Sequence, residues 1–408
     1  MNICMVLENY FPPDIRVEKE ARSLLGAGHK IFLLSLGKEG MRPVEDVKGI
    51  TVIRILPPQN PIKRVLGTFS FSILFESNFW RKNLEKVIKK YKIDIIHCHD
   101  LHLVKTSIYC AKKYDIPIIA DLHENFPEGI KAWRKEKTSI KFRAYNRLHF
   151  PFPMGFYKRF ERSILKKVDH IVTVVDEAKR HYIDDCEIPL DKVTVVMNTE
   201  DLEEFEKIKI QESFFTKFKN NYVITFLGNL SPHRGLETVI KSMPKIIEIM
   251  PEAKLLLVGG KGQERYEKQL KTMCVDLKVE HSVVFIGWVN FSLVPSYVVL
   301  SDVCLVPHNA SGHTHTTIPH KLFQYMIMRK PVIVTDCRPL KRIVEECDCG
   351  IVVPSHGYNE MTKAVIRLYE NKDYAEQLGE NGRKAVVDKY NWKRDGKKLV
   401  EVYKRFTI

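Results

Sequence analysis

The sequence lacks the features that would place the chain outside the cell or across a membrane. Its first residues, MNICMVLENYFPP, have no basic leader before the apolar run, so they predict a first strand and not a signal peptide. No stretch reaches the roughly 18 to 20 uncharged apolar residues that span a bilayer. The nine cysteines form neither a disulfide ladder nor paired CxxC knuckles. We therefore expect a cytoplasmic protein with reduced thiols.

Acidic residues are too few to balance the basic ones, and the net charge is +15. Such a charge requires a nucleic acid, an anionic membrane or a phosphorylated ligand as partner. Residues 130 to 167 carry twelve basic side chains against two acidic ones. Aromatic residues lie between these cations, an arrangement that suits an anionic membrane surface: Trp133, Phe142, Tyr145, Phe150, Phe152, Phe156, Tyr157 and Phe160.

An alternative for this segment stays open, namely a solvated helix face whose aromatic rings pack inward. Nucleic acid is not expected as a partner, because no nucleic-acid-binding module accompanies the charge. If the membrane interpretation holds, the protein is peripheral on the inner face of the cell membrane.

Short β-branched runs alternate with helical patterns along the whole chain, with one interruption. The first half contains NICMVLE, KIFLLSL, DIIHCH, PIIADLH, HIVTVV and KVTVVMN; residues 199 to 221 are polar and strandless; the second half contains VITFLGN, AKLLLVGG, VVFIGWV, VCLVPH, PVIVTD and GIVVP. Nearly continuous apolar strands separated by helices predict parallel sheets covered on both faces. The fold class is therefore α/β, with two Rossmann-like, doubly wound domains facing a cleft and ligands beyond the carboxyl ends of the strands.

Two helix starts in the second half can hold an anion. In FLGNLSPHRGLE a strand ends in a glycine turn and a helix begins near Gly235, with Arg234 beside it. Backbone amides at such a start favour a diphosphate, although a plain turn between strand and helix gives the same pattern. In TTIPHKLFQYM, Pro319 suits the first turn of a helix and Lys321 adds a positive charge. Together the two starts can hold one diphosphate ligand.

The chain resembles the retaining GT-B glycosyltransferases of family 4 over essentially its full length. The resemblance rests on segments in the right order: ENYFPPDIRVEKEARSLLGAGHKIFLLSL, DIIHCHDLHL, ADLHENFPE, FLGNLSPHRGLETVI, LLLVGGKG, VVFIGWV, IPHKLFQYMIMRKPVIVTD and YNWKRDGKKLVEVYKRF. It implies an acceptor domain at residues 1–198, a nucleotide-sugar donor domain at 199–388, and a terminal helix at 389–408 that crosses back onto the first domain.

The resemblance also implies residue roles in the second domain. Arg234 and Lys321 are the catalytic cations expected on the donor diphosphate, where they stabilise the leaving group without a metal. Backbone after one strand would border the nucleotide base, and the second helix start would close over phosphates and sugar. The further substrate-binding residues implied are Gly228, Asn229, Gly235, Gly287, Trp288, Val289, Thr316, Ile318, Pro319, His320 and Gln324.

In the first domain the resemblance implies that His123 is catalytic and meets the transferred sugar, with Glu124 as its neighbour. Arg16 would lie on a loop that approaches the phosphates. A structural histidine at a strand end is the alternative for His123, and a hydrogen bond to a sugar hydroxyl is the alternative to proton transfer by its ring.

The sequence departs from the family where Glu-x7-Glu is usual, since those positions are Thr316 and Gln324. Asn229 stands where an arginine is frequent. The amide oxygen of Gln324 can still accept from a ribose hydroxyl. A catalytically degenerate homologue that acts as a binding subunit therefore stays open.

The clustered histidines and cysteines of this sequence do not predict a metal site. Histidines 308, 313, 315 and 320 have neither carboxylates nor thiols near them in sequence, and zinc needs about four convergent ligands. Cys347 and Cys349 are poorly spaced for a zinc knuckle. No cofactor and no metal are expected.

These patterns together predict transfer of a hexose or N-acetylhexosamine from a UDP- or GDP-sugar, with retention, to a lipid-linked or polysaccharide acceptor. A sugar-nucleotide epimerase or hydrolase on the same fold is the alternative enzyme. The nucleotide sugar and the saccharide or lipid-linked acceptor are the expected partners.

Overall fold

The computed structural model describes residues 1–59, 71, 73–135, 150–260 and 264–406. The chain divides into two compact units, which are described separately. Unit 1 comprises Met1–Met197 with Lys393–Ile408, and unit 2 comprises Asn198–Trp392. The chain thus leaves unit 1 once and returns to it with its last residues.

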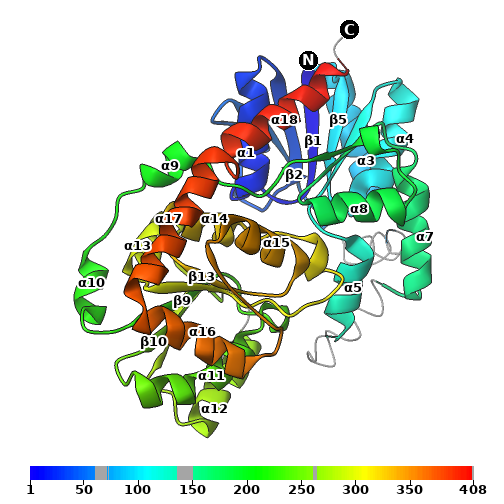
Figure 1. The fold of residues 1–408 in the computed structure, drawn as a ribbon. Helices are drawn as coiled ribbons and strands as arrows, with labels where there is room; N and C mark the ends of the chain where they lie inside the picture. The colour runs from blue at the N-terminus through cyan, green and yellow to red at the C-terminus, as the bar shows by residue number, and fades with distance from the viewer. Residues whose placement is uncertain (60–70, 72, 136–149, 261–263, 407–408) are drawn as a thin grey trace. The chain divides into compact units, whose positions relative to one another are not determined.

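Unit 1 contains an eight-stranded sheet in the order β3-β4-β2-β1-β5-β6-β7-β8 (Figure 1). Every neighbouring pair is parallel except β3 with β4, which is antiparallel. The strands are β1 (Asn2–Tyr10), β2 (Lys30–Leu36), β3 (Val44–Val47), β4 (Ile50–Ile55), β5 (Ile95–His99), β6 (Ile118–Leu122), β7 (His170–Thr173) and β8 (Val193–Val195).

Helices cover this sheet: α3 and α4 pack together on β1, α4 also contacts β5 and β6, and α1 packs on β2. Asp14 caps α1 by accepting a hydrogen bond from the Val17 amide, which satisfies one exposed donor of the first turn. The helices are α1 (Ile15–Gly26), α3 (Asn78–Tyr91), α4 (Leu101–Tyr114), α5 (Phe126–Lys135), α7 (Met154–Leu165), α8 (Asp176–Asp184), the short η1 (Leu190–Lys192) and α18 (Trp392–Lys404).

Unit 2 contains a six-stranded, wholly parallel sheet in the order β11-β10-β9-β12-β13-β14. In this doubly wound order the connections reverse between β9 and β12, where ligands bind beyond the carboxyl ends. The strands are β9 (Val223–Leu227), β10 (Lys254–Val258), β11 (Val283–Gly287), β12 (Val303–Val306), β13 (Val332–Thr335) and β14 (Gly350–Val353).

Helices α11, α12 and α16 share one core with this sheet, while α14 packs on β12, β13 and α17. The helices are α9 (Leu202–Glu206), α10 (Ser213–Phe218), η2 (Pro232–Arg234), α11 (Leu236–Ile249), α12 (Glu264–Asp276), η3 (Phe291–Leu293), α13 (Val294–Leu300), η4 (Thr314–Thr316), α14 (His320–Ile327), α15 (Arg338–Cys347), α16 (Tyr358–Glu370) and α17 (Lys372–Asp388).

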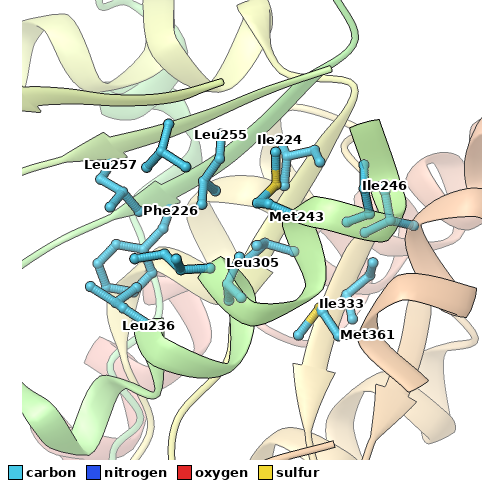
Figure 2. Close-up of a cluster of buried hydrophobic side chains, with 14 of the residues drawn as sticks. Ile224, Phe226, Leu236, Met243, Ile246, Leu255, Leu257, Leu305, Ile333 and Met361 are labelled. Carbon is cyan, nitrogen blue, oxygen red and sulfur yellow. The ribbon is translucent and has the colours of Figure 1, made fainter. Parts of the chain in front are cut away.

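The core of unit 2 lies between α11 and the central strands (Figure 2). Met243 and Ile246 of α11 lie over Ile224 of β9, Leu255 of β10 and Ile333 of β13, all of them buried. Burying such side chains contributes roughly 1.5–3 kcal/mol each. This packing fixes the strand ends that carry the site.

The predicted fold class is confirmed, with two α/β units on parallel sheets. All twelve predicted strands are present, but the sequence analysis missed β3 and β4. Among the described residues, no helix is both long enough and apolar enough to cross a bilayer.

Candidate active site

The candidate site of unit 2 lies where the connections of its sheet reverse. Gly228 directly follows β9, and His308 lies two residues beyond β12, the next strand of the sheet. The 3-10 turn η2 carries Arg234 from the end of β9 into the start of α11. Two connections, one after β9 and one after β12, therefore bring cationic and imidazole side chains to one edge of the sheet.

Two glycines make this arrangement possible. Gly235 has φ +68°, and a Cβ there would lie 1.9 Å from the Pro307 carbonyl oxygen. Gly228 has φ +130°, and its Cβ would lie 2.8 Å from Lys321 Nζ. The Gly228 amide donates to the Val258 carbonyl, and the Gly235 amide donates to the Pro232 carbonyl. These glycines thus provide space for neighbouring groups.

Arg234 is held by a histidine. Its Nη1 donates to His308 Nε2 over 2.8 Å. Burial, with the charges of Arg234 and Lys321, holds the pKa of His308 well below its usual range. His308 is therefore neutral and accepts from the guanidinium, so it orients Arg234 without adding charge.

Lys321 is a buried cation at the start of α14. Its Nζ lies 3.7 Å from the centre of the Phe226 ring and has no hydrogen-bond partner among the described residues. Burial and the nearby charge of Arg234 hold the pKa of this ammonium well below its usual range. A buried, unsatisfied ammonium is costly, so an anion that pairs with both cations would be stabilised here.

The loop histidine His313, next to this pair, is also neutral. Burial, with His233 and Arg234, lowers the pKa of His313 to about 4. The rings of His233 and His313 lie 5.9 Å apart. Within the described residues, no group of metal ligands forms around these histidines.

Glu200 reaches α14 from the segment after β8, and sequence reasoning missed it. Its Oε1 accepts from Gln324 Nε2 over 2.7 Å and lies 3.5 Å from His320 Nδ1. This contact orients the amide of Gln324. Next to it, Asn198 Nδ2 donates to the Ile318 carbonyl over 3.0 Å. A carboxylate is therefore present beside Gln324 although the helix itself has none.

The other predicted residues of unit 2 lie around this centre. Thr316 ends η4, and its hydroxyl donates to the Gly312 carbonyl over 2.9 Å. Pro319 occupies the position before the first residue of α14, and Asn229 is exposed. Gly287 is the last residue of β11, and Trp288, which is 61% exposed, and Val289 follow it.

Unit 1 holds a second cluster, centred on the buried Asp121 at the end of β6. Asp121 Oδ2 lies 2.6 Å from His123 Nε2 and 3.1 Å from His99 Nδ1, and Oδ1 lies 2.7 Å from Arg16 Nη2. Burial alone would raise the pKa of Asp121, but the charges of Arg16 and His123 hold it well below its usual range. Asp121 is therefore a carboxylate that orients three side chains.

Arg16 differs from our prediction. It is the second residue of α1 and not part of a loop, and it is 4% exposed. Its guanidinium binds Asp121, the Val196 carbonyl oxygen at 2.9 Å and Glu20 at 2.9 Å. These contacts lie within unit 1, where Arg16 neutralises Asp121 and Glu20.

His123 carries a positive charge at neutral pH. Burial would lower its pKa, but Asp100 and Asp121 raise it to about 10. Its Nδ1 lies 3.5 Å from Asp100 Oδ1, and Asp100 has a strained φ of 60°. An imidazolium at neutral pH has a proton on both ring nitrogens, so in this state His123 can donate a hydrogen bond but cannot accept a proton.

The terminal helix reaches the same cluster. His97 Nδ1 lies 2.6 Å from the hydroxyl of Tyr403 in α18, and His97 Nε2 lies 3.5 Å from Glu20 Oε2. Sequence reasoning missed Glu20, His97, His99, Asp121 and Tyr403 as parts of the site. His97, His99 and Asp121 are polar residues inside strands that are otherwise apolar. That contrast could have identified them as site residues.

Glu20, His97, His99 and Asp121 are close enough together to be ligands of one ion. The guanidinium of Arg16, however, already binds both carboxylates. A second cation there would be repelled, so the cluster acts as a positioning network. Glu124, the neighbour of His123, is half-buried beside Gly129 of α5.

The basic segment is described only in part, because residues 136–149 lie outside the described residues. On α7 the cations Lys158, Arg159 and Arg162 are exposed, whereas Tyr157 is buried. Phe160 stacks on Phe75, with ring centres 4.0 Å apart. In this part the cations face solvent and the aromatic rings pack inward.

Comparisons with known proteins agree with this architecture. Residues 15–204 match the model of Glycosyltransferase Family 4, and residues 207–385 match that of Glycosyl transferases group 1. The two matches together cover most of the chain. The chain therefore belongs to the family 4, group 1 glycosyltransferases, which have the GT-B fold.

Among individual relatives, an uncharacterized glycosyltransferase of Methanocaldococcus jannaschii is 25% identical, over 99% of this chain and 98% of that protein. The Escherichia coli UDP-Gal:alpha-D-GlcNAc-diphosphoundecaprenol alpha-1,3-galactosyltransferase is 22% identical, over 79% of this chain and 78% of that protein.

Among solved structures, Anabaena HepE in complex with UDP-glucose is similar with a TM-score of 0.73 and 13% identity, over 99% of this chain and 100% of that one. At that identity the similarity concerns the fold alone.

Proposed function

We propose that the protein transfers a hexose or N-acetylhexosamine from a UDP- or GDP-sugar, with retention, to a lipid-linked or polysaccharide acceptor. The observation that carries the proposal is the pair of cations, Arg234 and Lys321, at the carboxyl edge of the sheet of unit 2. A diphosphate would give Lys321 Nζ the partner that it lacks among the described residues.

The two cations also supply the electrostatics of the reaction. Negative charge builds up on the diphosphate as its bond to the sugar breaks, and fixed cations stabilise that charge. Arg234 is already oriented by His308 and so needs little rearrangement. We therefore propose that transfer requires no metal, and it should persist in EDTA.

Binding of the nucleoside would depend on groups next to these cations. The amide oxygen of Gln324 accepts from a ribose hydroxyl, since Glu200 holds its Nε2. Trp288, exposed after β11, offers an apolar surface to the base. In unit 1 the imidazolium of His123 donates to a hydroxyl of the transferred sugar or of the acceptor.

Two relatives support the substrate classes. The E. coli protein is named for UDP-galactose as donor and a diphosphoundecaprenol-linked acceptor, and the Anabaena protein binds UDP-glucose. Retention is the usual outcome in the family that this chain resembles. The base, the sugar and the acceptor need direct assay.

The test is a donor panel of UDP- and GDP-hexoses and N-acetylhexosamines, incubated with membrane lipid extract and analysed by mass spectrometry. A glycosylated lipid or saccharide is the expected product. Free sugar alone would indicate a hydrolase, and an isomerised nucleotide sugar an epimerase. Neither binding nor turnover of any donor would refute the proposal.

Arg234→Ala should abolish turnover, with Arg265→Ala as the matched control. Arg265 is exposed on α12 in the same unit, so its loss should leave turnover unchanged. Equal loss in both variants would contradict the assigned site.

We further propose that α7 attaches the protein to an anionic membrane, at the inner face of the cell membrane. The exposed cations of α7 support this attachment. Lys158→Glu with Arg159→Glu should weaken sedimentation with anionic liposomes, and salt should do the same in the wild type. The control is the same charge reversal, to glutamate, of the exposed pair Lys89 and Lys90 of α3. Sedimentation that is insensitive to anionic lipid would exclude the attachment.

A further inference from the structure

A second group of metal-ligating side chains lies in unit 1, apart from the Asp121 cluster. It joins Glu161 of α7, His181 of α8 and Cys186, which follows α8. Glu161 and Cys186 are 1% and 2% exposed, and the side chain of His181 is 14% exposed. A carboxylate, an imidazole and a thiol therefore converge where solvent reaches only one of them readily.

The separations of the three atoms fit a metal ion. Glu161 Oε2 lies 3.1 Å from His181 Nε2, and Cys186 Sγ lies 3.8 Å from that oxygen and 3.9 Å from that nitrogen. The centre of this triangle is about 2.1 Å from each atom, against zinc distances of about 2.0–2.3 Å to oxygen, nitrogen and sulfur. An ion fits between the atoms without moving them far.

The surroundings also suit a ligand histidine. His181 Nδ1 lies 2.8 Å from Asp185 Oδ2, so this carboxylate holds the ring with Nε2 turned toward the other two ligands. A carboxylate on the outer nitrogen is the usual support for a histidine that binds metal. The neighbouring cations Arg162 and Lys166 pair with Glu187. The carboxylate of Glu161 is therefore available to the cluster.

We propose that Glu161, His181 and Cys186 bind one Zn²⁺, with water in the fourth position. The donor set of thiolate, imidazole and carboxylate is one that zinc accepts. Binding releases the thiol proton of Cys186 to solvent, and no electron is transferred. The ion ties α7, the helix with the exposed cations, to α8. This proposal is independent of the proposed transferase activity.

The probe is Co²⁺ added to metal-free, reduced full-length protein, because a cobalt–thiolate bond gives a charge-transfer band in the near ultraviolet. One equivalent should produce the band, and Zn²⁺ should remove it. Cys186→Ser should lack the band, while Cys110→Ser, which alters another buried thiol of unit 1, should retain it. His181→Asn should weaken metal binding at least tenfold.

Thermal unfolding supplies a second measurement that needs no variant. Because the ion binds only the folded unit, micromolar Zn²⁺ should raise the Tm by several degrees, and the rise should grow with the logarithm of its concentration. A band that persists in Cys186→Ser, or wild-type protein that gains neither band nor stability, would overturn the proposal. In that case the cluster is a histidine held by two carboxylates.

Discussion

Lys321→Met tests the donor site because it should change binding and stability in opposite directions. Methionine has nearly the shape of the lysine stem but no charge, so it removes an ammonium that pairs with no described residue. An ammonium that binds the donor diphosphate contributes about 1.5–3 kcal/mol as a charge-assisted hydrogen bond. The Kd for UDP-glucose, or for the GDP-sugar that binds, should rise about 10- to 150-fold.

Stability should increase in the same variant. An unsatisfied buried polar group costs about 1–3 kcal/mol, and more when it is charged. The lost cation–π contact with Phe226 is offset by a sulfur–aromatic contact of similar size. A gain of about 1 kcal/mol corresponds to roughly 2–4 °C in the Tm of a unit of this size.

Calorimetric titration and thermal unfolding of one preparation give both quantities. Lys330→Met is the control, because Lys330 precedes β13 at the opposite edge of the same sheet; donor affinity should be unchanged there. If Lys321→Met binds donor normally, or loses stability together with binding, the assignment of Lys321 to the diphosphate is wrong.

Three further predictions follow from the same geometry. Because burial and Arg234 depress the pKa of Lys321, a bound diphosphate should raise that pKa; UDP-glucose affinity should fall as pH rises, and titrations in buffers of different ionisation enthalpy should show proton uptake. Asp121→Asn leaves Arg16 without its main partner and should destabilise unit 1 by about 3–5 kcal/mol in urea unfolding; a loss below 1 kcal/mol would contradict the network. Gly235→Ala, with φ +68° and a Cβ 1.9 Å from Pro307 O, should lower the Tm and donor affinity together, and an unchanged Tm would show that the turn relaxes freely.

The strands could be predicted because they are buried and β-branched. Runs such as those of β9 and β10 are apolar over their whole length, which is typical of strands covered on both faces. Strand β3, VEDV, is a polar edge strand, and β4, ITVIRI, follows it closely and has the polar residues Thr51 and Arg54 within it. Neither is the continuous apolar run from which the other strands were predicted, so both were missed.

The cations of the site could also be predicted, since helix starts and glycines are local signals. The contacts between side chains far apart in the sequence could not be predicted. Glu200 and Gln324 are 124 positions apart, Arg16 and Asp121 are 105 apart, and His97 and Tyr403 are 306 apart. Only the folded chain shows which polar residues meet, and for Arg16 it shows two carboxylate partners that the sequence did not predict.

The most direct test of the donor site compares UDP with UMP, and GDP with GMP, in binding to the wild type and to Arg234→Ala with Lys321→Met. If the two cations hold the β-phosphate, the wild type should prefer the diphosphate at least about 100-fold, and the double variant should bind the two nucleotides almost equally. A preference that survives in the double variant would contradict the account.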